Sequence, residues 1–187
     1  MRQLFLQSAL IAGLVGTALA PHAFADQHDP SLPKLFQFLK TTTSPDEAGA
    51  LEDRIWSVWA ETGDPALDKL MISSSDAMDR NDFRSALKDL DAITARKPNF
   101  AEGWNKRATV YYLMGDYEKA LSDLDRALKL EPRHFGALSG LGLTNMKLGR
   151  DEAAVDAFER VLQIDPLYPN AKLNLELAKD AMKRNSI

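Results

Sequence analysis

The sequence predicts an all-α protein, a solenoid built from helix–turn–helix units of 34 residues. Pro98, Pro132 and Pro166 stand 34 residues apart. Three alanines and two glycines keep the same period, namely Ala86, Ala120, Ala154, Gly115 and Gly149. A fixed period of this length is typical of solenoids, in which each unit buries its apolar face only against its neighbours. The predicted units are 67–100, 101–134 and 135–168.

The clearest unit is 101–134. Small residues at its positions 8 and 20 let two helices approach closely, and large residues at positions 4, 11, 17 and 24 fill the space between helix pairs. Gly115 permits the turn between the helices. Pro132 pushes Glu131 out of helical geometry, so the second helix ends there. The residues that carry the pattern are Trp104, Ala108, Tyr111, Gly115, Tyr117, Ala120, Leu124, Ala127 and Pro132.

This unit resembles the tetratricopeptide repeat, whose consensus has these residue types at these positions. Unit 135–168 resembles the family at Gly142, Phe158 and Pro166 among others, and unit 67–100 is similar at fewer positions. Arg107 stands where the family usually has Leu. The resemblance implies a right-handed superhelix, and the chain looks like the small exported members of the family found in alphaproteobacteria.

Helices are also predicted on both sides of the three units. The capping box at Ser44-Pro45-Asp46-Glu47 starts one, and Leu32–Lys40 forms another. We therefore expect a linker and a divergent helical hairpin in residues 26–66, with the hairpin covering the N-terminal end of the stack; a fourth repeat is the alternative. Residues 169–187 predict one amphipathic capping helix that closes the C-terminal end.

Residues 1–25 have the features of a secretory signal peptide. Arg2 is their only charge, Leu4–Val15 is mostly apolar, and Ala23-Phe24-Ala25 is a small-x-small cleavage site. An uncleaved anchor is the alternative, although the apolar stretch is shorter than the ~20 residues of a spanning helix. The chain has no cysteine, which suits an oxidising compartment. We expect export to the periplasm of a Gram-negative bacterium, with cleavage after Ala25.

The motif content argues against catalysis. Beyond residue 25 the only histidines are His28 and His134, and neither has a partner at the spacing of a metal site or a catalytic triad. The run Gly136-Ala-Leu-Ser139-Gly140 lacks the strand that precedes a nucleophile elbow. The sequence therefore predicts no enzyme activity, no catalytic residue, no cofactor and no metal.

The charged residues favour neither catalysis nor nucleic-acid binding. Asp89 with Asp91, and Asp123 with Asp125, are two residues apart on predicted helices, so each pair points to different faces and is expected to be solvated surface charge. Cleavage would remove one base, Arg2, and no acid, so the net charge would change from −4 to −5. Without a basic tract, nucleic acid and anionic membrane are poor partners.

The family resemblance implies that the first helices of the units line a concave groove. Its commonly exposed positions are occupied here by methionine, leucine, amides and hydroxyls, a surface that suits a peptide with apolar anchors. The carboxylate clamp of chaperone-binding relatives is not supported, because Met71, Ser75, Lys106, Gly136 and Gly140 occupy its places. The candidate groove residues are Met71, Ser75, Met78, Asn105, Lys106, Thr109, Tyr112, Ser139, Leu143, Met146, Leu173, Asn174 and Leu177.

Three functional interpretations follow. The favoured one is a periplasmic adaptor that binds a peptide segment of an envelope or secretion component in the groove. The alternative is a structural homo-oligomer, formed through the repeat surface or the region of Trp56 and Trp59. Action outside the cell after further export is a third interpretation.

Overall fold

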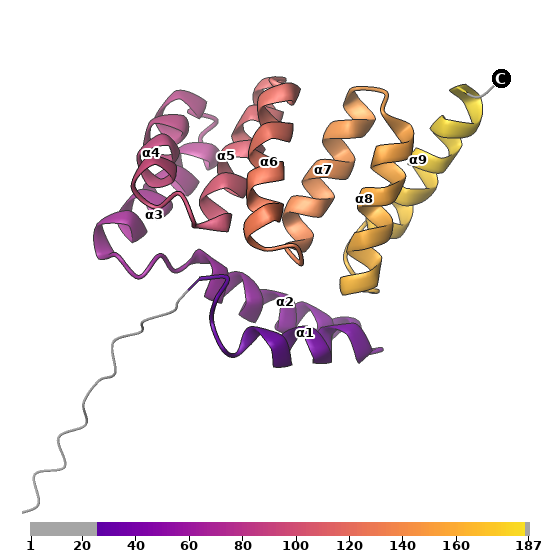
Figure 1. Ribbon diagram of the computed structural model, residues 1–187, viewed down its shortest axis with the longest axis horizontal. Coiled ribbons are helices and arrows are strands. Elements are labelled where there is room, and N and C mark those ends of the chain that lie inside the picture. The colour runs from indigo at the N-terminus through magenta and orange to yellow at the C-terminus, as the bar shows by residue number, and fades with distance from the viewer. Residues whose placement is uncertain (1–25, 186–187) are drawn as a thin grey trace, which may run out of the picture.

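The computed structural model describes residues 26–185, and within this range it is helical with no strand (Figure 1). The predicted all-α class is therefore confirmed. No helix in residues 26–185 has both the length and the apolar character needed to span a membrane. The described helices are α1 (Leu32–Thr41), α2 (Pro45–Ala60), α3 (Pro65–Asp79), α4 (Phe83–Arg96), α5 (Ala101–Met114), α6 (Tyr117–Leu130), α7 (Phe135–Lys147), α8 (Asp151–Ile164) and α9 (Ala171–Asn185).

The helix ends follow local sequence signals. Helices α4, α6 and α8 each end two residues before one of the periodic prolines. Gly115, with φ 82°, closes α5 in the left-handed region, which glycine adopts without steric cost. Ser44 caps α2 by accepting a hydrogen bond from Glu47 N, as predicted, whereas the Glu47 carboxylate accepts from Thr42 rather than from the cap residue. The capping box is therefore only half formed.

Helices α3 to α9 stand side by side in one curved row (Figure 1). Each helix contacts the next in sequence along this row. Close approach inside a helix pair depends on small residues: a Cβ on Gly142 would lie 2.5, 2.6 and 2.8 Å from ring carbons of the buried Phe158. Leu175 and Ala178 of α9 pack against Phe158 at the C-terminal end of the row.

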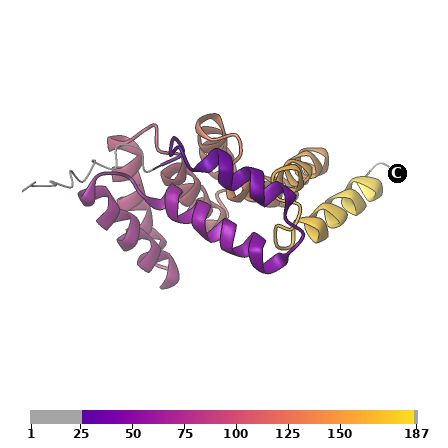
Figure 2. The ribbon, with the colours of Figure 1, turned by 90° about the horizontal axis from the view of Figure 1, so that it is seen from below.

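The helical hairpin of α1 and α2 does not cover the N-terminal end of the stack, so that expectation is wrong. Figures 1 and 2 show the two helices lying across the lower ends of the row's helices, beneath α5, α7 and α8. Phe36 and Trp59 of the hairpin share one apolar core with Phe135, Leu138 and Val161 of the third unit. Burial of these apolar side chains holds the hairpin in this position.

The N-terminal segment reaches all three turns between units. At the α4–α5 turn, Lys97 forms an ion pair with Asp26 at 2.9 Å, and Gln27 accepts a hydrogen bond from Ala101 N at 3.3 Å. At the α6–α7 turn, the Trp59 ring stacks on His134 with centroids 4.1 Å apart. At the α8–α9 turn, Glu52 of α2 interacts with Asp165. Residues 26–60 therefore connect the ends of successive units.

Arg107 connects the first two units, and two of the acidic residues expected on the surface are its partners. Its Nε and Nη2 donate to the two carboxylate oxygens of Asp123 at 2.7 and 2.8 Å, and its Nη1 donates to Asp91 at 2.8 Å. The hydrogen bonds to Asp123 raise the pKa of Arg107 above its usual range. Asp123 is only 4% exposed, so the expectation of solvated charge is wrong for it and remains apt for Asp125.

Candidate functional site

The exposed large apolar side chains of the described residues gather on one set of helices. None of them is on α4, α6 or α8, the second helices of the units. One is on the hairpin, and the others are on α3, α5 and α9, the row of first helices and the closing helix. They are Phe38, Ile72, Leu113, Met114, Leu173 and Leu177.

A central pocket of about 280 Å³ lies between α5 and α7. Tyr112 and Leu113 approach it from α5, and Ser139 and Leu143 approach it from α7. Tyr168, from the α8–α9 turn, also lines it. None of its lining side chains is charged at neutral pH, so the pocket offers apolar surface with a few hydroxyl groups.

A second pocket, of about 530 Å³, lies between α2, α3 and α5 and is called here the N-terminal pocket. Ile72, which is 63% exposed, and Met71 form apolar parts of its wall. Glu61, Asp68 and Asp76 also line it. Lys106 is its one basic lining residue, and Lys106 Nζ donates to Ser75 Oγ at 3.0 Å.

The candidate groove residues are divided between these pockets and the core. Thr109, Tyr112, Ser139 and Leu143 line the central pocket, and Met71, Ser75 and Lys106 line the N-terminal pocket. The other candidate groove residues line neither of these two pockets. They are Met78 and Met146, which pack against core clusters, Asn105, which is buried, and Leu173, Asn174 and Leu177, which lie on α9. Their contact with a partner stays a prediction.

Asn105 belongs to a buried polar network that the sequence did not indicate. Its Nδ2 donates to Glu102 Oε2 at 2.8 Å, and His134 Nε2 lies 3.0 Å from the same oxygen. Because His134 Nδ1 accepts the hydrogen bond of Ala137 N, the proton of a neutral His134 is on Nε2, facing Glu102. His134 is fully buried, so the network serves packing rather than solvent-accessible chemistry.

Trp56 and Trp59 pack on this network. Trp59 is 1% exposed and stacks on His134. Trp56 makes edge contacts with His134 and Phe135, with ring centroids 5.4 Å apart in each case. A Cβ on Gly136 would overlap the Trp56 ring, so the hairpin requires glycine at one of the positions of the carboxylate clamp. Trp59 is therefore taken up by the fold and Trp56 is half-buried, and self-association through this region stays a prediction.

Two carboxyl groups meet where the hairpin contacts the α8–α9 turn. Burial first, and then the charge of Asp165, raises the pKa of Glu52 to about 7. Burial also raises the pKa of Asp165, whose Oδ2 has no hydrogen-bond partner among the described residues. Burial and these two acids raise the pKa of Tyr168 to about 12. Burial and like charge disfavour ionisation of both carboxyl groups at once, and one proton held between Glu52 and Asp165 would supply the missing partner.

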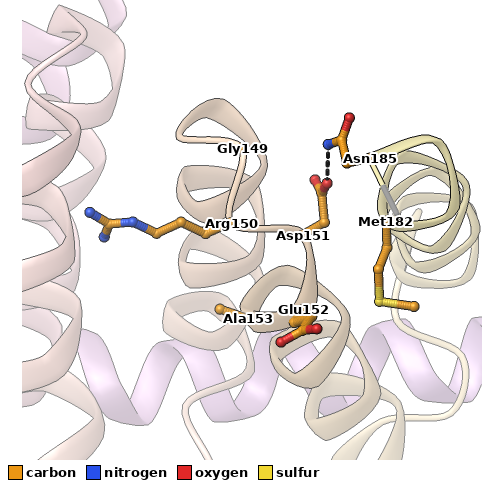
Figure 3. Close-up of a pocket in the computed structure, with 7 residues that line it drawn as sticks. All are labelled: Gly149, Arg150, Asp151, Glu152, Ala153, Met182 and Asn185. Atoms are coloured by element: carbon orange, nitrogen blue, oxygen red, sulfur yellow. Dashed lines mark hydrogen bonds between the residues drawn. The ribbon is translucent and has the colours of Figure 1, made fainter. Parts of the chain in front are cut away.

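A third pocket, of about 380 Å³, lies between the α7–α8 turn and the end of α9 (Figure 3). Asn185 Nδ2 donates to Asp151 Oδ2 at 2.6 Å across it, while Arg150 extends away from the two. Arg150 is instead paired with Glu118 at 2.7 Å. Among residues 26–185, no group of three or more His, Asp or Glu side chains lies close enough together to hold a metal ion.

Comparison with known proteins agrees with this architecture. A sequence model of the tetratricopeptide repeat matches residues 74–124 and 105–169, together more than half of the chain. A TPR repeat-containing protein of Rhizobium etli is 34% identical over 106 residues, which are 54% of this chain and 52% of the relative. The chain therefore spans about half the length of the curated relative that it matches.

Several solved structures share the fold. The Sgt2 TPR domain of Aspergillus fumigatus is 24% identical with a TM-score of 0.62, over 66% of this chain and 83% of that one. The first TPR of Spaghetti (RPAP3), bound to an HSP90 peptide, is 21% identical with a TM-score of 0.61, over 63% and 93%. The TPR2B domain of yeast Sti1, in a complex with pHsp70, is 16% identical with a TM-score of 0.58, over 63% and 97%.

Proposed function

The chain belongs to the tetratricopeptide repeat family, and we propose that it is a periplasmic adaptor that binds a peptide segment of an envelope or secretion component. The distribution of exposed apolar residues carries this proposal. Ile72 and Leu113 are 63% and 51% exposed on the first helices, while the second helices have no such residue among those described. Exposed apolar side chains concentrated on the first helices are typical of an interaction surface.

The central pocket would hold an apolar anchor of the bound segment. Its volume of about 280 Å³ is close to the lower end of the range for ligand pockets, which suits one or two side chains. Among solved structures of the same fold, the first TPR of RPAP3 is bound to an HSP90 peptide, and the Sti1 domain is in a complex with pHsp70. The pocket residues Tyr112 and Ser139 would face the segment from opposite sides.

The periplasmic part of the proposal rests on residues 1–25 of the sequence. Asp26, the first residue after the predicted cleavage site, forms an ion pair with Lys97. A mature chain that begins at Asp26 would therefore keep the described contacts of the fold. Cell fractionation and N-terminal sequencing of the exported protein test this part, and a cytoplasmic protein that retains Met1 would contradict it.

Site-specific photo-crosslinking in cells tests the adaptor. A photoreactive residue at Tyr112 or Ser139 should trap the same envelope protein, whereas one at the exposed Lys129 of α6 should not. Trapping from Lys129 to the same extent, or no product from either groove position, would overturn the proposal.

Self-association is the second candidate, and the closing helix favours it. Leu173 and Leu177 are 59% and 48% exposed, one turn apart on α9. A second copy of the chain could cover them. Light scattering on the chain without residues 1–25 should then give a dimer that Leu177→Ser converts to monomer, and a monomer at all concentrations would exclude this candidate.

A further inference from the structure

The two groove pockets flank α5 on the same face of the row and differ in charge. Lys106 and Ser75 line the N-terminal pocket, and Thr109 and Ser139 line the central pocket. On α5, Lys106 precedes Thr109 by three residues, about one helical turn, so the two side chains share the face of α5 that a bound segment would cross. A single bound chain that crosses α5 would therefore place side chains in both pockets.

The N-terminal pocket combines an apolar wall with carboxylates. Met71 and Ile72 provide the wall, and Glu61, Asp68 and Asp76 line the pocket with them. Asp68 is engaged, because it accepts hydrogen bonds from Thr62 N at 2.9 Å and Thr62 Oγ1 at 2.6 Å. Three carboxylates against one ammonium leave the pocket negative at neutral pH.

The carboxylates of Glu61 and Asp76 make no hydrogen bond or ion pair with other side chains among residues 26–185, and both residues are exposed. The only basic lining residue, Lys106, donates to Ser75 Oγ. Negative charge is therefore left available to a bound molecule. A lysine or arginine side chain fits both features, since its aliphatic stem covers apolar surface while its charged end stays near solvent and carboxylates.

The distance between the pockets limits the sequence of the bound segment. A helix with its side chains is about 10–12 Å across, and an extended chain advances about 3.3 Å per residue. Crossing α5 therefore takes three or four residues of an extended segment. The central pocket, which has no charged lining residue, suits the apolar member of the pair.

We infer that the groove selects an extended protein segment in which a lysine or arginine lies three or four residues from a leucine, isoleucine or phenylalanine. The basic side chain enters the N-terminal pocket beside Glu61 and Asp76, and the apolar side chain enters the central pocket. This inference rests on the proposed function, because it specifies the partner of the same groove. It also separates this groove from a carboxylate clamp, which would require basic side chains on the protein.

Selection from a random 12-residue peptide library displayed on phage tests the inference, with the chain lacking residues 1–25 as the target. Enriched peptides should carry the basic and apolar residues at the stated spacing. Fluorescence anisotropy of one synthetic enriched peptide should show binding that weakens by about fivefold to tenfold in the double variant Glu61→Gln, Asp76→Asn. Binding should also weaken as the salt concentration is raised, because Glu61 and Asp76 are exposed and salt screens their attraction for the basic side chain of the peptide.

Two further variants separate the possible failures. The double variant Asp89→Asn, Asp125→Asn removes the same charge from the second helices and should change affinity less than twofold, about the effect of a distant exposed charge. Ser139→Arg fills the central pocket and should abolish binding. Circular dichroism confirms that each variant is folded.

If Ser139→Arg abolishes binding but enriched peptides lack a basic residue, or both double variants weaken binding equally, the inference is wrong and the groove remains a peptide site. If Ser139→Arg leaves binding unchanged, or no peptide is enriched, the proposed function fails together with the inference.

Discussion

The contact between Glu52 and Asp165 makes the stability of the fold depend on pH. Glu52 has a pKa of about 7 in the folded chain against an ordinary value of 4.5, with burial as the first cause and the charge of Asp165 as the second. Between these two pH values the folded state holds a proton that the unfolded state has released. The free energy of unfolding therefore falls as the pH rises from about 4.5 to about 7, and changes little above that through this group.

The size of the effect follows from the same two values. The difference between 4.5 and about 7 corresponds to at most about 3 kcal/mol. Because Glu52 is only partly buried, solvent screening reduces this to about 1–2 kcal/mol. For a chain of this size, that amounts to a shift of several degrees in the unfolding temperature, at about 2–4 °C per kcal/mol.

Glu52→Gln isolates this contribution, because the amide cannot ionise and its NH₂ group can donate to Asp165 Oδ2. At pH 8 the variant should be more stable than the natural chain by about 1–2 kcal/mol, and at pH 5 the two should be nearly equal. Urea unfolding followed by far-UV circular dichroism at both pH values measures the difference. Glu176→Gln, an exposed change on α9, serves as the control.

The reasoning would be refuted if the natural chain and Glu52→Gln showed parallel pH dependence. It would also be refuted if Glu52→Gln were the less stable of the two at pH 8. Either result would mean that the two carboxyl groups do not share a proton in the folded state, and that their ionisation does not affect the stability of the docked hairpin.

Three other substitutions should destabilise the fold by distinct mechanisms, each measurable by urea unfolding. Arg107→Leu leaves Asp123 buried and unpaired, and should lower the free energy of unfolding by about 2–4 kcal/mol. The double variant Arg107→Leu, Asp123→Leu should regain most of this stability, and a double variant no more stable than the single one would contradict the reasoning. Gly142→Ala should cost about 1–3 kcal/mol through overlap with Phe158, and Phe158→Leu should offset part of that cost; a neutral Gly142→Ala would disprove the overlap. His134→Ala should cost about 2–4 kcal/mol and change tryptophan fluorescence, because the stacked ring and the hydrogen-bonded partner are lost together; an unchanged spectrum would argue against the stacking.

Part of the candidate site could be predicted from sequence and part could not. Thr109, Tyr112, Ser139 and Leu143 converge on one pocket because the repeat pattern places their positions on one face of neighbouring helices. The acidic side of the groove was missed. Glu61 follows α2, outside the repeated units, so no periodic position indicated that it would line a pocket with Asp76 of α3.

The sequence by itself determined the elements of this protein. Gly115, the cap at Ser44 and the periodic prolines act within one or two turns of chain, where backbone sterics and local hydrogen bonds decide the conformation. The all-α class follows from the 34-residue period, which is that of stacked helix–turn–helix units.

Only the tertiary structure decided where the hairpin docks and which charges become buried. Trp59 stacks on His134, Glu52 meets Asp165, and Asp26 pairs with Lys97, all between residues more than 70 positions apart. Contacts of this kind depend on the curvature of the row and on the apolar side chains at its turns. No local pattern encodes that curvature, because it results from the packing of all the units together.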